Sequence, residues 1–242
     1  MTIAHTTNLA ELLASMGAAG KRLNAIDAIE AGAGNLSASC NWNLDLTETF
    51  PDTTDIDLPL AVPNLAGYTV LVTGTGCRLR EVADDPASNV GAVTIHQDGT
   101  TGTLHYRADG NFTRPTSEFN SHLAVHNDQV GRRGLDFHAV IHAQPPHLVQ
   151  LSHIPAYQST TTLNQAILRW EPETIVQLPA GVKFLPFMVP GSQELMENNV
   201  AGLRDHVITI WAKHGLMARS DISPLAACDK IEYWAYPDFV DT

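Results

Sequence analysis

Cysteine is scarce in this sequence. The 242 residues include only three cysteines, at positions 40, 77 and 228. A sparse and odd number of cysteines argues against a disulfide framework and is typical of a reducing compartment, so we expect a cytoplasmic protein. The sequence also contains no Cys-x-x-Cys pair, which argues against a structural zinc knuckle.

Positive charge is scarce as well. The chain has 14 Lys and Arg residues against 26 Asp and Glu residues, and its net charge is -12. Such an acidic surface repels nucleic acids and anionic membranes, so we expect neither as a partner. If the substrate carries a phosphate, a metal ion and backbone N–H groups must supply the local positive potential.

Long apolar runs are absent. No stretch approaches the roughly 18 apolar residues that would indicate a membrane span. The N-terminal sequence MTIAHTTNLAELLASMG has neither the basic region nor the apolar core of a signal peptide. The chain is nevertheless 44% hydrophobic and long enough to bury a large core. Nothing in it resembles a linker, so we predict one domain over residues 1–242.

Periodicity predicts an α/β fold with a central, mostly antiparallel sheet covered by helices. The prolines of the stretch 49–66 predict a loop there. The predicted helices cover residues 8–18, 22–31, 116–130, 158–169, 191–204 and 222–235, with one more after Pro146. The predicted strands cover residues 36–42, 68–74, 89–97, 102–107, 137–143, 173–179, 207–215 and 215–219.

Histidines are the first candidates for chemistry, because the chain has 11 of them. His138 and His142 have even spacing on a predicted strand and therefore share a face with Gln144. His214 ends another predicted strand, directly before Gly215. Imidazole is a common metal ligand, but a single histidine at a strand end is more often a hydrogen-bonded structural residue.

A strong helix start follows from the sequence PTSE at residues 115–118. The proline fixes φ, the two hydroxyls can cap the helix, and Glu118 places an acid in its first turn. The segment is either an ordinary helix start or an anion site that also brings Glu118 to a ligand. His122 and His126 follow at intervals of four residues, on the same helical face.

Two glycine-rich segments, GAGNLS (32–37) and TGTGCR (73–78), adjoin predicted strands. They are either tight turns or loops whose backbone and neutral side chains approach a ligand.

Taken in order, GNLS, VTGTG, PTSE, the strand with His142, PFMVPG and KHG resemble the class II aldolase and adducin-like superfamily. The resemblance runs from about residue 30 to about residue 235 and is strongest to the group of rhamnulose-1-phosphate aldolases. It implies an enzyme that cleaves a ketose 1-phosphate with the help of a divalent metal, expected to be zinc.

The resemblance also implies roles for particular residues. Glu118 is similar to the catalytic acid/base of the family, and the metal ligands are expected to be His142, Gln144 and His214. Glu173 corresponds to an acid that reaches the site of a neighbouring subunit in a homotetramer. The residues expected to bind the substrate phosphate are Gly34, Asn35, Thr75, Gly76, Thr116 and Ser117.

The sequence departs from the family pattern at two positions. Gln144 stands where the family has a second histidine, and His147 is an alternative third ligand. Gly32 replaces an asparagine that helps to hold phosphate. The last residues, YWAYPDFVDT, are also expected to end the domain earlier than in relatives. Two other functions therefore stay open: a sugar-phosphate epimerase or decarboxylase of the same superfamily, and a metal-poor, non-catalytic relative like the adducin head.

Overall fold

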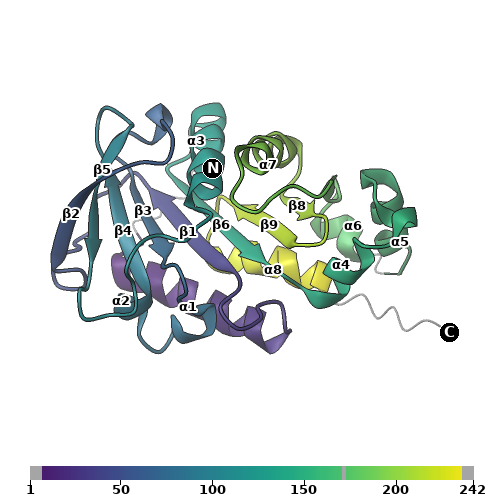
Figure 1. The fold of residues 1–242 in the computed structure, drawn as a ribbon, viewed down its shortest axis with the longest axis horizontal. Coiled ribbons are helices and arrows are strands. Elements are labelled where there is room, and N and C mark those ends of the chain that lie inside the picture. The colour runs from purple at the N-terminus through teal and green to yellow at the C-terminus, as the bar shows by residue number, and fades with distance from the viewer. Residues whose placement is uncertain (1–6, 171–172, 236–242) are drawn as a thin grey trace.

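A nine-stranded sheet forms the centre of the protein (Figure 1). The structure is a computed structural model that describes residues 7–170 and 173–235; the expected early end of the domain falls on residues 236–242 and lies outside them. The strand order is β2-β5-β4-β3-β1-β6-β9-β8-β7, and all neighbours are antiparallel except β7 and β8. The strands are β1 (Asn35–Cys40), β2 (Asp52–Asp57), β3 (Thr69–Thr73), β4 (Val90–Ile95), β5 (Thr101–Tyr106), β6 (Phe137–Ala143), β7 (Lys183–Leu185), β8 (Ile208–Trp211) and β9 (Gly215–Ser220).

Helices cover both faces of the sheet (Figure 1), which confirms the predicted fold class. Two of them, α3 (Phe119–Arg133) and α7 (Gln193–Asp205), pack together over one face, and α1 (Leu9–Ala25) and α8 (Pro224–Ala235) pack together over the other. The shorter helices are α2 (Pro86–Asn89), α4 (Pro146–Leu151), α5 (Thr160–Trp170), α6 (Glu173–Gln177), η1 (Pro63–Leu65), η2 (Leu79–Glu81) and η3 (Pro155–Tyr157). Within the described residues, no helix combines the length and apolar character that a membrane crossing needs.

The strand β1 is buried along its whole length, yet its two faces differ. Leu36, Ala38 and Cys40 belong to the large apolar core that includes α1 and α8. Side chains alternate along a strand, so the other face carries the polar residues Asn35 and Ser37, with Ser39 after them. This polar row lies next to α3 and leads directly to the cavity described below.

The neighbouring strand β6 repeats this alternation. Ile141 and Ala143 enter the same apolar core as β1, whereas Val140 belongs to a separate cluster with residues of α7 and β8. The register pairs Asn35 of β1 with His142 of β6. The sequence prediction that His138 and His142 share one face of their strand is therefore confirmed.

Three predicted elements are wrong. Residues 22–31 are not a separate helix, because α1 continues to Ala25 and the following residues turn. Between the two predicted ranges α1 approaches η2 closely: a Cβ atom on Gly20 would lie 2.1 Å from the carbonyl oxygen of Leu79.

The other two errors concern β2 and α6. The predicted loop 49–66 contains β2, which pairs with β5; Pro51 and Pro59 flank this edge strand rather than interrupt it. The predicted strand 173–179 is instead the helix α6; Thr174 in this helix and Leu178 directly after it are buried at a helical spacing of four.

Candidate metal centre

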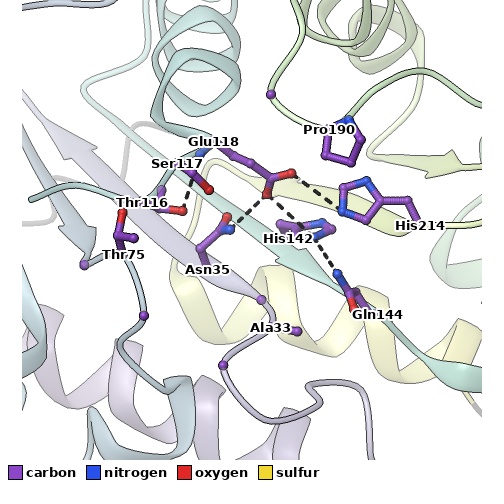
Figure 2. A pocket seen from close by; sticks show the side chains of 15 residues that line it. Ala33, Asn35, Thr75, Thr116, Ser117, Glu118, His142, Gln144, Pro190 and His214 are labelled. Carbon is purple, nitrogen blue, oxygen red and sulfur yellow. Dashed lines mark hydrogen bonds and ion pairs between the residues drawn. The ribbon is translucent and has the colours of Figure 1, made fainter.

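A cavity of about 280 Å³ opens at the junction of β1, β6 and the start of α3 (Figure 2). It collects every site residue predicted from the sequence except Glu173, which is exposed on α6. The lining residues are Gly32, Ala33, Gly34, Asn35, Gly74, Thr75, Gly76, Thr116, Ser117, Glu118, His142, Gln144, Pro190, Gly191 and His214. Among these described residues none is a Lys or an Arg, so any anion in the cavity must be held by neutral donors or a metal ion.

Three potential metal ligands meet in this cavity. The carboxylate of Glu118 lies 3.6 Å from Nε2 of His142 and 3.7 Å from Nε2 of His214 (Figure 2). One ligand atom from each residue can be chosen so that all three lie within 4.8 Å of one another. Ligand atoms around a tetrahedral zinc ion are about 3.3 Å apart. Side-chain rotations that move these atoms by about 1 Å would therefore let all three bind one ion. Two imidazoles and a carboxylate are a donor set that fits a divalent metal.

The sheet fixes the tautomer of His142. Its Nδ1 atom donates a hydrogen bond to the carbonyl oxygen of Leu216 on β9, at 2.8 Å. In the neutral ring Nε2 therefore carries the free lone pair, and Nε2 is the atom that faces Glu118 and His214. A backbone carbonyl behind the ligand is a common way to orient a metal-binding histidine.

Burial and neighbouring groups set the protonation of the cluster. Burial acts to raise the pKa of Glu118, but His142, the hydrogen bond from Asn35 and His214 outweigh it and lower that pKa. Burial, together with the nearby His142, lowers the pKa of His214 to about 4, although Glu118 acts in the opposite direction. A carboxylate next to neutral imidazoles is the state that binds a cation, because metal ligands must be deprotonated.

Gln144 and His147, the two candidates for a further ligand, occupy different positions. Gln144 lines the cavity, and its Nε2 atom lies 3.5 Å from Nε2 of His142. Turning its amide would bring the carbonyl oxygen to the same place. His147 lies on α4 with an exposed side chain and does not line the cavity.

The two predicted glycine turns and the PTSE segment form one wall of the cavity. Thr75 donates from Oγ1 to the carbonyl oxygen of Pro115 at 2.7 Å, and Gly74 forms an isolated bridge with the same proline. Gly76 has a φ of 79° and open space around its Cβ position, so its conformation, rather than crowding, requires glycine. The wall exposes backbone and hydroxyl groups to the cavity, while the threonine hydroxyl is already occupied as a donor.

The start of α3 differs in one respect from the prediction. The regular helix begins at Phe119, and Glu118 is the N-cap residue. Glu118 is also buried, although a residue at a helix start is usually exposed. It is buried because its side chain points into the cavity, where Asn35 donates from Nδ2 to the Glu118 carboxylate at 2.9 Å.

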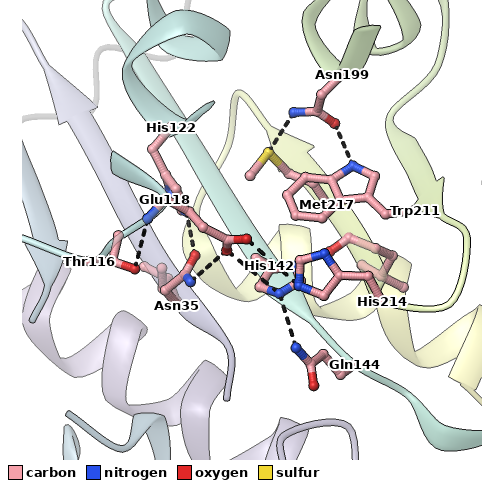
Figure 3. Close-up of polar contacts among 12 residues, drawn as sticks. Asn35, Thr116, Glu118, His122, His142, Gln144, Asn199, Trp211, His214 and Met217 are labelled. Atoms are coloured by element: carbon pink, nitrogen blue, oxygen red, sulfur yellow. Dashed lines mark hydrogen bonds and ion pairs between the residues drawn. The ribbon is translucent and has the colours of Figure 1, made fainter. Parts of the chain in front are cut away.

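Sequence reasoning missed Trp211. This residue of β8 stacks against His142, with ring centroids 4.7 Å apart and an interplanar angle of 17°, and its centroid lies 5.1 Å from that of His214 (Figure 3). Asn199 accepts a hydrogen bond from its indole nitrogen at 2.9 Å and thereby fixes the ring. A tryptophan in an apolar strand resembles any other core residue, so no signal in the sequence identified this role.

Comparison with known proteins agrees with the fold. The model of the class II aldolase and adducin N-terminal domain matches residues 14–236, which is most of the chain. The protein therefore belongs to the class II aldolase and adducin family. Enzymes of the class II aldolase type use a divalent metal, and the Glu118–His142–His214 cluster is a possible site for one.

Particular relatives narrow the comparison. The rhamnulose-1-phosphate aldolase of Bacteroides thetaiotaomicron is 30% identical over 173 residues, which cover 72% of this chain and 62% of that protein. The enzyme of the same name from Citrobacter koseri is 28% identical over 194 residues, covering 77% of this chain and 68% of the relative. The matched part thus spans about three fifths to two thirds of these relatives.

Solved structures show the same fold at lower identity. A sugar-phosphate aldolase from Thermotoga maritima superposes with a TM-score of 0.77 at 24% identity and covers 94% of this chain and 92% of its own. An L-fuculose-1-phosphate aldolase from Thermus thermophilus gives a TM-score of 0.58 at 19% identity, covering 93% and 90%.

Proposed function

We propose that this protein is a metal-dependent aldolase that reversibly cleaves a ketose 1-phosphate, L-rhamnulose 1-phosphate, to dihydroxyacetone phosphate and lactaldehyde. The observation that carries the proposal is the cluster of Glu118, His142 and His214 inside a cavity that also contains the two glycine turns. The names of the relatives at about 30% identity support this choice of substrate.

Each part of the cavity has a task in this proposal. His142 and His214, with Gln144 beside them, hold the divalent ion, for which zinc is proposed. When bound, the ion stabilises the negative charge that develops beside the substrate carbonyl as the carbon–carbon bond breaks. Glu118 moves the proton: in the synthetic direction it takes a proton from dihydroxyacetone phosphate, and in cleavage it returns one.

The substrate phosphate is proposed to bind at the wall formed by Gly34, Thr75, Gly76, Thr116 and Ser117. Backbone N–H groups and hydroxyls can hold an anion without a charged side chain. Asn35 lines the same wall, but its side chain already contacts Glu118 and His122, so its proposed contribution to phosphate binding is through the backbone.

We also propose a cytoplasmic homotetramer in which Glu173 reaches the cavity of a neighbouring subunit. Ile175 and Val176, beside it on α6, are 50% and 71% exposed. Phe187 and Val189 are also exposed, directly before the cavity residue Pro190. Exposed apolar side chains of this kind are typical of interfaces. The cysteines at positions 40, 77 and 228 are free and buried, which supports a reducing compartment.

Metal analysis followed by a coupled assay tests the proposed activity. We expect about one divalent ion per chain and release of dihydroxyacetone phosphate from L-rhamnulose 1-phosphate, lost on chelation and restored by zinc. Conversion of a sugar phosphate to its epimer without this release would assign the protein to the epimerases. Absence of both metal and turnover would support a non-catalytic relative. Light scattering at micromolar concentration tests the assembly, and a monomer would contradict the tetramer.

A further inference from the structure

A row of buried polar side chains leads from Glu118 into the interior of the protein, between β1, β6 and α3. We call it the interior chain; it consists of Asn35, His122, Ser37, His126 and His138. Its first part is visible in Figure 3, where Asn35 lies between Glu118 and His122. From Glu118 inward, the successive heavy-atom distances are 2.9, 2.5, 2.6, 2.7 and 2.8 Å.

The local structure explains how these residues meet. Asn35 and Ser37 project from one face of β1, and His122 and His126 lie one helical turn apart on α3. All three histidines are buried, and none is a member of the proposed metal cluster. Three imidazoles in a protein interior are costly unless their hydrogen bonds are satisfied, so their arrangement requires an explanation.

The direction of each hydrogen bond follows from the chemistry of the groups. Asn35 donates to the carboxylate of Glu118, so its Oδ1 atom is the acceptor that faces Nε2 of His122. Nε2 of His122 must then carry a proton. Because burial lowers the pKa of His122 to about 3, the ring is neutral and its Nδ1 atom must accept. The hydroxyl of Ser37 is the group at this nitrogen, so Ser37 donates to it.

The same reasoning continues to the end of the interior chain. Ser37 has a single proton, so its contact with His126 requires Nε2 of His126 to donate. Burial is the main cause that keeps the pKa of His126 low, and the nearby His138 adds to it. The ring of His126 is therefore neutral and accepts a hydrogen bond at Nδ1. The donor is Nδ1 of His138. His138 is then left with an unprotonated Nε2 atom, which is buried and has no hydrogen-bond partner.

All five hydrogen bonds therefore have the same direction, with each donor on the side away from Glu118. The opposite direction would turn the Asn35 amide and place its oxygen 2.9 Å from a carboxylate oxygen, where two acceptors repel each other. Hydrogen bonds in such a row polarise one another. An amide does not readily pass a proton on, so Asn35 makes the row a means of orientation rather than a proton path.

We propose that Ser37, His122, His126 and His138 are positioning residues for Glu118, which act by fixing the Asn35 amide through a one-way row of hydrogen bonds. The proposal rests on the proposed function, in which Glu118 is the acid/base. It assigns a function to the histidines of α3 beyond the packing of that helix.

Histidine tautomers, measured by NMR with selective ¹⁵N-histidine labelling of the full chain, test the interior chain directly. We expect His122 and His126 to carry their proton on Nε2, and His138 to carry it on Nδ1. The opposite tautomer at any of the three, or a doubly protonated ring, would overturn the proposal. This measurement does not depend on any turnover, so it stays decisive if the proposed aldolase activity fails.

The kinetic test compares Ser37→Ala with Ser39→Ala. Both serines are fully buried on β1, but Ser39 lies beside the inner end of the row, with its hydroxyl 3.2 Å from Nδ1 of His126 and 3.3 Å from the backbone oxygen of His138. Its removal leaves all five hydrogen bonds between Glu118 and His138 in place. We expect Ser37→Ala to lower kcat at least about tenfold with KM within about threefold, because a poorly oriented base affects the transition state. Ser39→Ala should keep kcat within about twofold. An equal loss of kcat in both variants, or no loss of kcat in Ser37→Ala, would contradict the proposal and show that the row has a structural role only.

Discussion

Two sets of contacts converge on the carboxylate of Glu118. His142 and His214 approach it from the cavity, and Asn35 approaches it from the interior. The buried carboxylate thus faces two imidazoles on one side and an amide donor on the other. Both the proposed proton transfer and the proposed metal cluster therefore depend on one side chain.

The substitution Glu118→Gln removes the charge of the carboxylate and keeps the shape of the side chain. The amide keeps the size of the side chain but can no longer exchange a proton at this position, so we expect turnover to fall by about 10² to 10⁴. Coupled release of dihydroxyacetone phosphate measures this loss, and circular dichroism controls for folding. A folded variant with turnover within twofold of the parent would remove Glu118 from its proposed role.

Gln144 stands directly after β6, at the position where the family pattern has a second histidine. An imidazole is a better zinc ligand than a neutral amide oxygen. We expect Gln144→His to tighten zinc binding at least about tenfold, or by about 1.4 kcal/mol. Competition titration with a zinc indicator measures the change.

His147→Ala is the matched control, because His147 is exposed and outside the cavity lining. We expect its zinc affinity to equal that of the parent. No gain in Gln144→His together with loss of metal in His147→Ala would contradict the assignment of Gln144 and favour His147 as the third ligand.

At the residue scale, the sequence predicted the cavity residues that belong to motifs whose order along the chain resembles that of the family. Glu118, His142 and His214 were recognised together because the order of their motifs resembles a family. The interior contact of Asn35 with Glu118 could not be predicted, because it depends on the register of β1 against β6 and on the start of α3. Trp211 was missed for a related reason: only its stacking on His142 distinguishes it from an ordinary core residue.

At the scale of elements, the close contact between β6 and β9 brings the two histidines of the proposed metal cluster together. His142 lies on β6, and His214 directly precedes β9. A Cβ atom on Gly215, the first residue of β9, would lie 2.4 Å from the carbonyl oxygen of Ala143 and 3.1 Å from Cε1 of His142. The absence of a side chain at Gly215 is therefore necessary for this spacing.

Gly215→Ala should push β6 and β9 apart at the site. We expect the free energy of unfolding to fall by about 1–3 kcal/mol, as is typical of overpacking, and zinc affinity to fall with it. Chemical denaturation and zinc titration measure the two effects. Gly32→Ala is the control, because the nearest atom to its added Cβ would be 3.8 Å away. Equal stability and zinc affinity in the two variants would contradict this account of β9.

Element prediction failed where tertiary contacts override local signals. The prediction ended one helix at residue 18 and began another at residue 22, whereas α1 is continuous there, and its Gly20 lies close to η2. The β-branched residues Ile175 and Val176 suggested a strand, although α6 exposes both of them. The strands of the sheet centre were predicted well, because burial gave them long runs of β-branched and apolar residues.

At the scale of the whole molecule, the buried histidines make stability depend on pH. Burial is the main cause that lowers the pKa values of His122, His126 and His138, so the folded protein keeps these rings neutral. In the unfolded chain they take up protons below about pH 6.5. The unfolded state then binds more protons, so the free energy of unfolding decreases as pH falls.

Three such groups predict a steep dependence. Below about pH 5.5, where the unfolded rings are almost fully protonated, we expect these three rings alone to contribute a loss of about 4 kcal/mol per pH unit. Urea denaturation at pH 7.5, 6 and 5 measures it. Replacement of the exposed His153 by Gln should leave the slope unchanged. Constant stability from pH 7.5 to 5 would show that the three rings are not kept neutral in the fold.

The strand order also has a consequence for the time course of synthesis. β1, β6 and β9 are neighbours in the sheet, but β9 follows β6 by more than seventy residues in the chain. During translation, β6 can pair with β1 as soon as it leaves the ribosome, while its other edge stays without a partner until β9 emerges. An open edge of this kind can pair with the wrong strand. The nascent chain therefore carries an aggregation-prone edge during the interval between the emergence of β6 and that of β9, and the arrival of the segment that brings His214 is also the event that closes this edge.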